Sequence, residues 1–190
     1  MSLTATDIQV LSGLAALISV MAGYFGYRRG RSNDFRVPFC TGILVTLIGA
    51  YSDAYYHLEG FAVTEGFFTP AHGVLYTGVL IMALSIFLLR GKRLVLPIEI
   101  GQRAQNIMFL GILIMLGGAV WDFVYHSING FIDVVAWTPP HLTVTAGFIV
   151  LLSAGIVTFW NKSGSMVKAS LGSSVALFAA LWITVLWLTL

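Results

Sequence analysis

The chain has 190 residues, of which 58% are hydrophobic and only 9% are charged. Soluble domains carry about 25% charged residues, so this composition excludes an ordinary soluble protein and indicates an integral membrane protein. The net charge of +2 rests on few charged residues and argues against nucleic acid as a partner, and the single cysteine excludes an internal disulfide or a cysteine-rich metal site.

Six apolar runs follow one another along the chain, and each is long enough to cross a bilayer as a helix, which takes roughly 20 apolar residues. In chain order they cover residues 8–27, 38–57, 70–89, 107–126, 139–160 and 169–190. Six such helices use about 120 residues and leave only short loops and ends. The sequence therefore predicts an all-α integral membrane protein, with residues 1–190 forming a single domain of six transmembrane helices.

The first run has an acidic residue before it, Asp7, and a cluster of arginines after it, beginning with Arg28. A cleavable signal peptide has the opposite order, with its positive charges first. We therefore expect residues 8–27 to be a helix that the protein retains.

Basic residues are segregated along the chain. All ten lysines and arginines lie within residues 28–36, 90–103 and 162–168. Because basic loops stay in the cytoplasm, this pattern predicts a multi-pass protein of the plasma membrane with both termini outside.

Two segments of the chain, 51–82 and 120–151, align with each other without a gap. The alignment places Asp53 on Asp122, His57 on His126 and His72 on His141, so it pairs all four histidines of the chain. Each segment covers a helix, a loop and the next helix. The sequence therefore predicts a parallel repeat of two helical hairpins, related by a pseudo-twofold axis along the membrane normal.

Each repeat contains Asp-x3-His at the end of one span and Thr-Pro-x-His at the start of the next. An Asp and a His four residues apart share one helix face. The Thr is placed to cap the next helix and the Pro to occupy its first position. The second histidine then lies in the first turn, where the helix dipole favours a neutral imidazole that can bind a metal. The predicted metal ligands, near the outer membrane boundary, are Asp53, His57, His72, Asp122, His126 and His141.

Two histidines and a carboxylate form a ligand set that suits copper, zinc or iron. An aspartate inside a spanning helix costs up to about 3 kcal/mol at the membrane centre, so its presence at two equivalent positions argues for a function. The alternative is a pair of intrahelical hydrogen bonds capped by the second histidines. Glu59, Glu65 and Asp133 in the outer loops are either supporting groups for these sites or solvated loop charges.

Two successive membrane hairpins each carry an acid, a histidine one helical turn later and a second histidine at the start of the next helix. This pattern resembles the C subunit of copper membrane monooxygenases, which are the particulate methane and ammonia monooxygenases. The run Phe68-Thr69-Pro70-Ala71-His72, followed by Leu75-Tyr76, is particularly similar to archaeal ammonia monooxygenase C subunits. The resemblance covers roughly residues 50–150.

This resemblance implies that Asp53, His57 and His72 match the family's copper site, and that Asp122, His126 and His141 match the neighbouring site. The second site usually begins with Asn in the family, so Asp122 is a departure. The resemblance further implies a copper cofactor, A- and B-like membrane subunits in a hetero-oligomer with trimeric organisation, and hydroxylation of a small substrate such as ammonia or a short hydrocarbon with O2.

Two other functions use the same residues. A membrane zinc hydrolase would act on lipid amides or esters with metal-bound water as the nucleophile. A non-catalytic metal-binding, transport or scaffold subunit would use the titratable groups as an ion path or for assembly. The inner halves of the spans offer only scattered Ser and Thr to continue such a path, which counts against a transporter. The sequence leaves open whether the two triads form one dinuclear centre.

Overall fold

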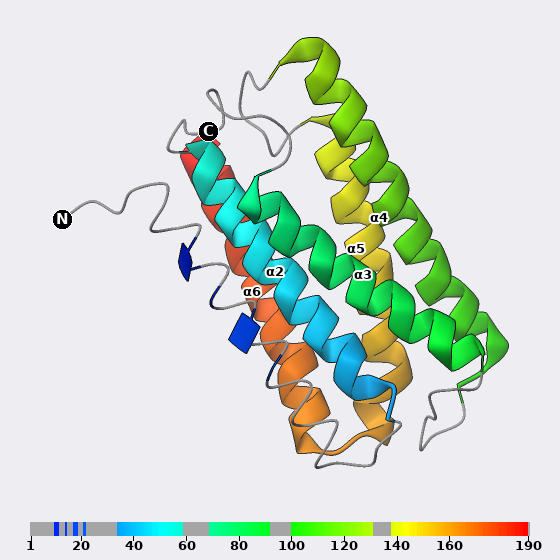
Figure 1. Cartoon of the computed structure of the whole chain (residues 1–190). Coiled ribbons are helices and arrows are strands. Elements are labelled where there is room, and N and C mark those ends of the chain that lie inside the picture. Colours follow the sequence, from blue (N-terminus) through cyan, green and yellow to red (C-terminus); the bar gives the residue numbers. More distant parts are fainter. Residues whose placement is uncertain are drawn as a thin grey trace.

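Five long helices make up most of the computed structural model, which describes residues 34–58, 69–91, 100–130 and 138–189, together with isolated positions between residues 10 and 21. They are shown in Figure 1. In chain order the elements are α2 (Arg36–Leu58), α3 (Pro70–Arg90), α4 (Gln102–Asn129), α5 (Pro139–Phe159), the short 3-10 helix η3 (Trp160–Lys162) and α6 (Ser165–Thr189).

All five long helices are long and apolar enough to cross a membrane. They confirm the all-α prediction and coincide with five of the six predicted helices, with ends that differ by a few residues. The largest difference is at α4, which begins at Gln102 rather than at residue 107. Its first turn is polar, and the Gln102 side chain donates a hydrogen bond to Asn106 Oδ1 at 3.0 Å. An apolar run alone therefore underestimates the length of this helix.

Some predictions fall on parts of the chain that the structure does not describe. Apart from isolated positions, the predicted first span, 8–27, lies outside the described residues. The loop acids Glu59, Glu65 and Asp133 also lie outside them.

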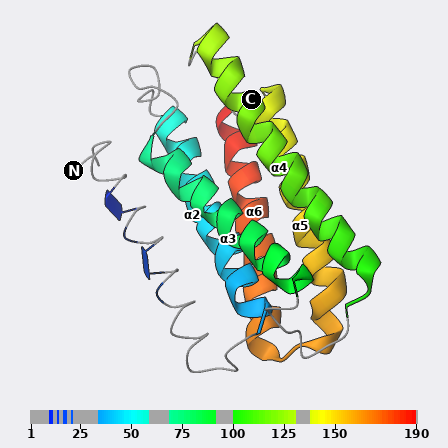
Figure 2. The ribbon, with the colours of Figure 1, turned by 45° about the vertical axis from the view of Figure 1, so that its right-hand side comes forward.

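The helices pair as two antiparallel hairpins, α2 with α3 and α4 with α5. The two hairpins contact each other through α3 and α4, and α6 packs against both α2 and α5. Figure 2 shows the bundle from a second direction, with α6 between α2 and α5. This arrangement brings together the end of α2, the start of α3, the end of α4 and the start of α5, where the candidate site lies.

Glycines allow close contact between the two helices of each hairpin. A Cβ atom added to Gly42 of α2 would lie 2.9 Å from the carbonyl oxygen of Gly78 of α3. A Cβ atom added to Gly111 of α4 would lie 3.0 Å from the carbonyl oxygen of Gly147 of α5. The two pairs correspond to each other in the same register that places Asp53 on Asp122. Each hairpin therefore has its backbones in direct contact at corresponding positions, as small residues permit in membrane helices.

From the sequence, the glycines within the apolar runs, such as Gly42, Gly49 and the Gly117–Gly118 pair, would allow close helix packing, unless they are simply common in membrane helices. Gly49 lies directly against the backbone of Leu75, and a Cβ atom on Gly118 would lie 2.9 Å from the backbone nitrogen of Val144, so both predictions are confirmed. The prediction is wrong for Gly117, where an added Cβ atom would meet nothing within 4 Å. Gly117 precedes Gly118 by one residue, so a Cβ atom on Gly117 would point to a different side of α4.

The apolar core lies between the helices and includes an aromatic group, Phe35, Phe39 and Phe159, near the start of α2 and the end of α5. The rings of Phe35 and Phe39 stack with their centroids 5.2 Å apart. Asp53 lies almost four helical turns beyond Phe39 along α2, roughly 20 Å away at about 1.5 Å per residue. The aromatic group and the polar site thus occupy opposite ends of the bundle.

Candidate metal centre

Polar side chains from four helices converge at the end of the bundle formed by the end of α2, the start of α3, the end of α4 and the start of α5. Helices α2 and α4 each supply an Asp and a His one turn later, and α3 and α5 each supply one His. We call this group the His/Asp cluster. It consists of Asp53, His57, His72, Asp122, His126 and His141.

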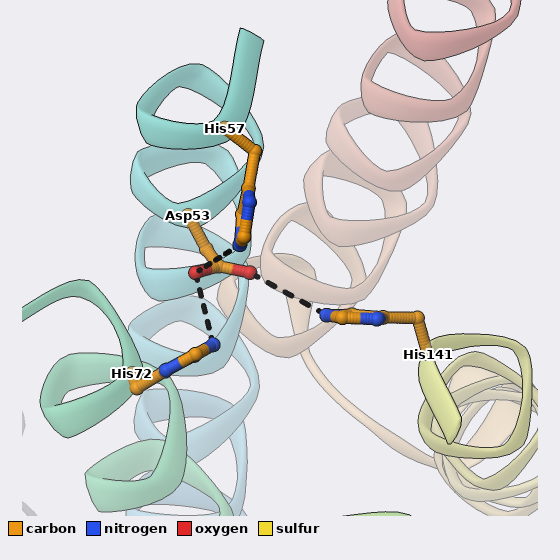
Figure 3. Close-up of side chains that lie close together, drawn as sticks. All are labelled: Asp53, His57, His72 and His141. Carbon is orange, nitrogen blue, oxygen red and sulfur yellow. Dashed lines mark ion pairs between the residues drawn. The ribbon is translucent and has the colours of Figure 1, made fainter. Parts of the chain in front are cut away.

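Three histidines surround the carboxylate of Asp53, as Figure 3 shows. His72 Nε2 lies 3.1 Å from Asp53 Oδ1, and His57 Nε2 lies 3.7 Å from the same oxygen. His141 Nε2 approaches the other oxygen, Oδ2, at 3.9 Å. Asp53 itself is only 5% exposed. The carboxylate therefore receives imidazoles from its own helix, from the paired helix α3 and from α5 of the other hairpin.

The carboxylate of Asp122 has a similar environment. His126 Nε2 lies 3.3 Å from Asp122 Oδ1, and His141 Nδ1 lies 3.4 Å from the same oxygen. His72 Nε2 approaches Asp122 Oδ2 at 4.0 Å. His72 and His141 therefore each contact both carboxylates, although each belongs to one hairpin.

The two predicted triads meet in space. The potential ligand atoms form two groups, and within each group the atoms all lie within 4.8 Å of one another. One group consists of Asp53, His57, His72 and His141, and the other of Asp122, His126 and His141. His141 belongs to both groups, a placement that the sequence alone does not predict.

The start of α3 matches the sequence prediction closely. Thr69 is the N-cap residue, Pro70 occupies the first turn, and Thr69 Oγ1 accepts a hydrogen bond from the backbone N–H of His72 at 3.2 Å. This bond satisfies one of the free N–H groups of the first turn and fixes the backbone that carries the His72 imidazole.

The start of α5 confirms the predicted positions of Thr138 and Pro139 but differs in the capping bond. Thr138 occupies the N-cap position of α5, but its side chain forms no capping hydrogen bond. Its hydroxyl group instead hydrogen-bonds Nδ1 of His141. The Thr138 hydroxyl therefore holds the His141 ring.

The end of α4 holds a second imidazole in place. His126 Nδ1 lies 3.0 Å from the carbonyl oxygen of Gly130, which suits an N–H donor on that nitrogen. A histidine that donates from Nδ1 presents Nε2 as a lone-pair donor, the arrangement common among metal-ligating histidines. Gly130 has a φ of 74°, in the region that favours glycine, and its N–H donates to the His126 carbonyl at 3.0 Å.

Tyr76 of α3 also belongs to the site, although the sequence pattern does not mark it as a ligand. Its side chain is hydrogen-bonded to Asp122 of α4, and its ring lies 5.9 Å from the His72 ring, measured between centroids. The sequence contains one indication of this placement: Tyr76 is four positions after His72 and therefore lies on the same helix face.

The residues of the cluster fit a bound metal ion. Asp53 Oδ1, Asp122 Oδ1 and His141 Nε2 are buried and form no hydrogen bond among the described residues. A buried polar atom without a hydrogen bond costs about 1–3 kcal/mol. A cation held between these atoms would compensate that cost, and imidazole nitrogens with carboxylate oxygens suit copper, zinc and iron.

Comparison with protein families, with curated proteins and with solved structures finds no match for the chain. The function is therefore inferred from the chemistry of the His/Asp cluster and from the sequence pattern.

Proposed function

We propose that the chain is a copper-binding subunit, or a relative of such a subunit, of a membrane-bound monooxygenase complex. The complex would hydroxylate a small substrate such as ammonia or a short hydrocarbon with O2. The observation that carries the proposal is the convergence of two aspartates and four histidines from four apolar helices in one cluster. The resemblance to the C subunits of copper membrane monooxygenases supports the same function.

The donor set accepts copper as it does zinc and iron, and the resemblance to copper membrane monooxygenases selects copper among them. Copper(II) binds nitrogen and oxygen ligands more tightly than the neighbouring divalent metals do, and imidazole is among its preferred ligands. Copper supplies the redox chemistry that activates O2. The protein's own residues hold the ion between imidazoles and carboxylates, and the surrounding helices limit access of water to those groups, since Asp122 is 1% exposed and His126 is 3% exposed.

We further propose that both triads contribute to one dinuclear centre, because His141 lies within contact distance of both carboxylates. The alternative is two independent mononuclear sites that happen to be neighbours. Shared contacts favour the single centre, because His72 and His141 each lie between the two carboxylates.

The membrane arrangement belongs to the same proposal. The six spans, the parallel repeat and the outward-facing termini are supported by the segregation of bases and by the corresponding glycine contacts of the two hairpins. In this topology the His/Asp cluster lies near the outer face of the plasma membrane. A- and B-like subunits complete the complex, as the resemblance implies.

The test is metal analysis of the native protein, purified with whatever subunits accompany it, and of the His57→Ala and His126→Ala variants. We expect copper in the native protein, and a lower copper content and lower O2-dependent activity in both variants. Ser127→Ala is the matched control, because Ser127 neighbours His126 but its hydroxyl donates a hydrogen bond to the Phe123 carbonyl of the same helix.

Full copper content and activity in both histidine variants would overturn the proposal. Zinc in place of copper, with activity that does not depend on O2, would instead indicate the hydrolase that uses the same ligands.

A further inference from the structure

The two halves of the His/Asp cluster have identical ligand types but different surroundings. In the alignment of the two hairpins, each Asp and His of the first corresponds to the same residue type in the second. Tyr76, which lies against this cluster, corresponds to Thr145. A threonine carries its hydroxyl one carbon from the backbone, whereas a tyrosine carries it at the far end of a ring.

Tyr76 also connects the two hairpins. It belongs to α3 of the first hairpin, and its hydrogen-bond partner Asp122 belongs to α4 of the second. In the same helix, Nε2 of His72 lies 4.0 Å from Asp122 Oδ2. One face of α3, carrying His72 and Tyr76 a turn apart, therefore contacts the carboxylate of the other half.

We propose that Tyr76 is a positioning residue that orients the Asp122 carboxylate and makes the two halves of the cluster unequal in metal affinity. This inference rests on the proposed metal-binding function. A carboxylate that receives a hydrogen bond from a fixed donor is held in one orientation, and loss of such a supporting bond typically lowers metal affinity about 10-fold to 100-fold. The loss is expected only at the half that contains Asp122.

Paired variants separate this role from a general effect on packing. Tyr76→Phe is combined with His57→Ala, which leaves the Asp122 half, and with His126→Ala, which weakens that half and leaves the Asp53 half. The full chain in detergent, stripped of metal with a chelator, is titrated with Cu2+ and followed by calorimetry and by the Cu(II) electron paramagnetic resonance spectrum. Tyr51→Phe is the control, because it also removes a tyrosine hydroxyl that forms a hydrogen bond, here to the Leu177 carbonyl.

We expect Tyr76→Phe to lower Cu2+ affinity about 10-fold to 100-fold in the His57→Ala background, with a changed spectrum, and to have no comparable effect in the His126→Ala background. Tyr51→Phe should leave both unchanged. Equal losses in the two backgrounds, or no loss in either, would overturn the role of Tyr76 while leaving the proposed function intact. A wild-type chain that binds no Cu2+ would overturn both.

Discussion

Replacing His141 by alanine tests whether the His/Asp cluster is one centre. The imidazole of His141 lies 3.9 Å from Asp53 Oδ2 through Nε2 and 3.4 Å from Asp122 Oδ1 through Nδ1. It is also the only residue common to the two potential ligand groups found among the described residues. We therefore expect His141→Ala to weaken metal binding at both halves.

The size of the effect follows from the composition of the two groups. His141→Ala reduces one group from four potential ligands to three and the other from three to two. Loss of even an outer supporting group lowers metal affinity about 10-fold to 100-fold, so we take that range as the minimum for each half. It corresponds to about 1.4 to 2.8 kcal/mol per bound ion. His57→Ala should produce such a loss only at the Asp53 half, because His57 belongs to one group.

The assay is a titration of the metal-free chain with Cu2+, comparing the stoichiometry and affinity of wild type, His141→Ala and His57→Ala. In His141→Ala both equivalents of Cu2+ should bind more weakly than in the wild type, and in His57→Ala only one equivalent should. If His141→Ala weakened only one equivalent and left the other at wild-type affinity, the triads would be independent and the reasoning from shared contacts would be refuted.

Three further predictions concern stability. Thr69→Ala removes the capping bond to His72 and should lower the free energy of unfolding by about 1 kcal/mol. The measurement is thermal or denaturant unfolding in detergent, and an unchanged free energy would show that the cap is dispensable. Gly78→Val places a side chain against the backbone of Thr46 and should lower the free energy of unfolding by at least about 1–3 kcal/mol. Gly73→Ala places a methyl group in open space and should not destabilise the protein. Equal effects of the two variants in the same unfolding assay would contradict the packing described. Removal of the metal by a chelator should lower the unfolding temperature, since an ion present at 100 times its dissociation constant contributes about 2.7 kcal/mol, and an unchanged temperature would argue against a bound ion.

Local features of the fold and the site could be predicted from the sequence. Runs of apolar residues predict α2 to α6 because a membrane helix must satisfy its own backbone groups. The Thr-Pro-x-His pattern predicts the start of α3, where Thr69 caps the helix and places His72. The spacing of Asp53 and His57 places both side chains on one face, and the structure has them in contact.

The relation between the hairpins could not be predicted in the same way. Nothing in the local pattern around His141 states that its ring lies between Asp53 and Asp122, because that position depends on how α5 packs against the other helices. Tyr76 was missed for the same reason, since its hydrogen-bond partner lies on the neighbouring hairpin. Thr138 shows that even a repeated motif can act differently, because its hydroxyl hydrogen-bonds an imidazole where Thr69 bonds the backbone.

The division of the cluster among four helices has a consequence for biosynthesis. A chain is made from its N-terminus, so Asp53, His57 and His72 are synthesised before α5. The cluster is complete only when His141 arrives with α5, after the whole of α4 has been made. Until then the first hairpin carries an aspartate and two histidines in an apolar setting without their final partners. Assembly of the centre is therefore a late event, and chains truncated before α5 should fail to acquire it.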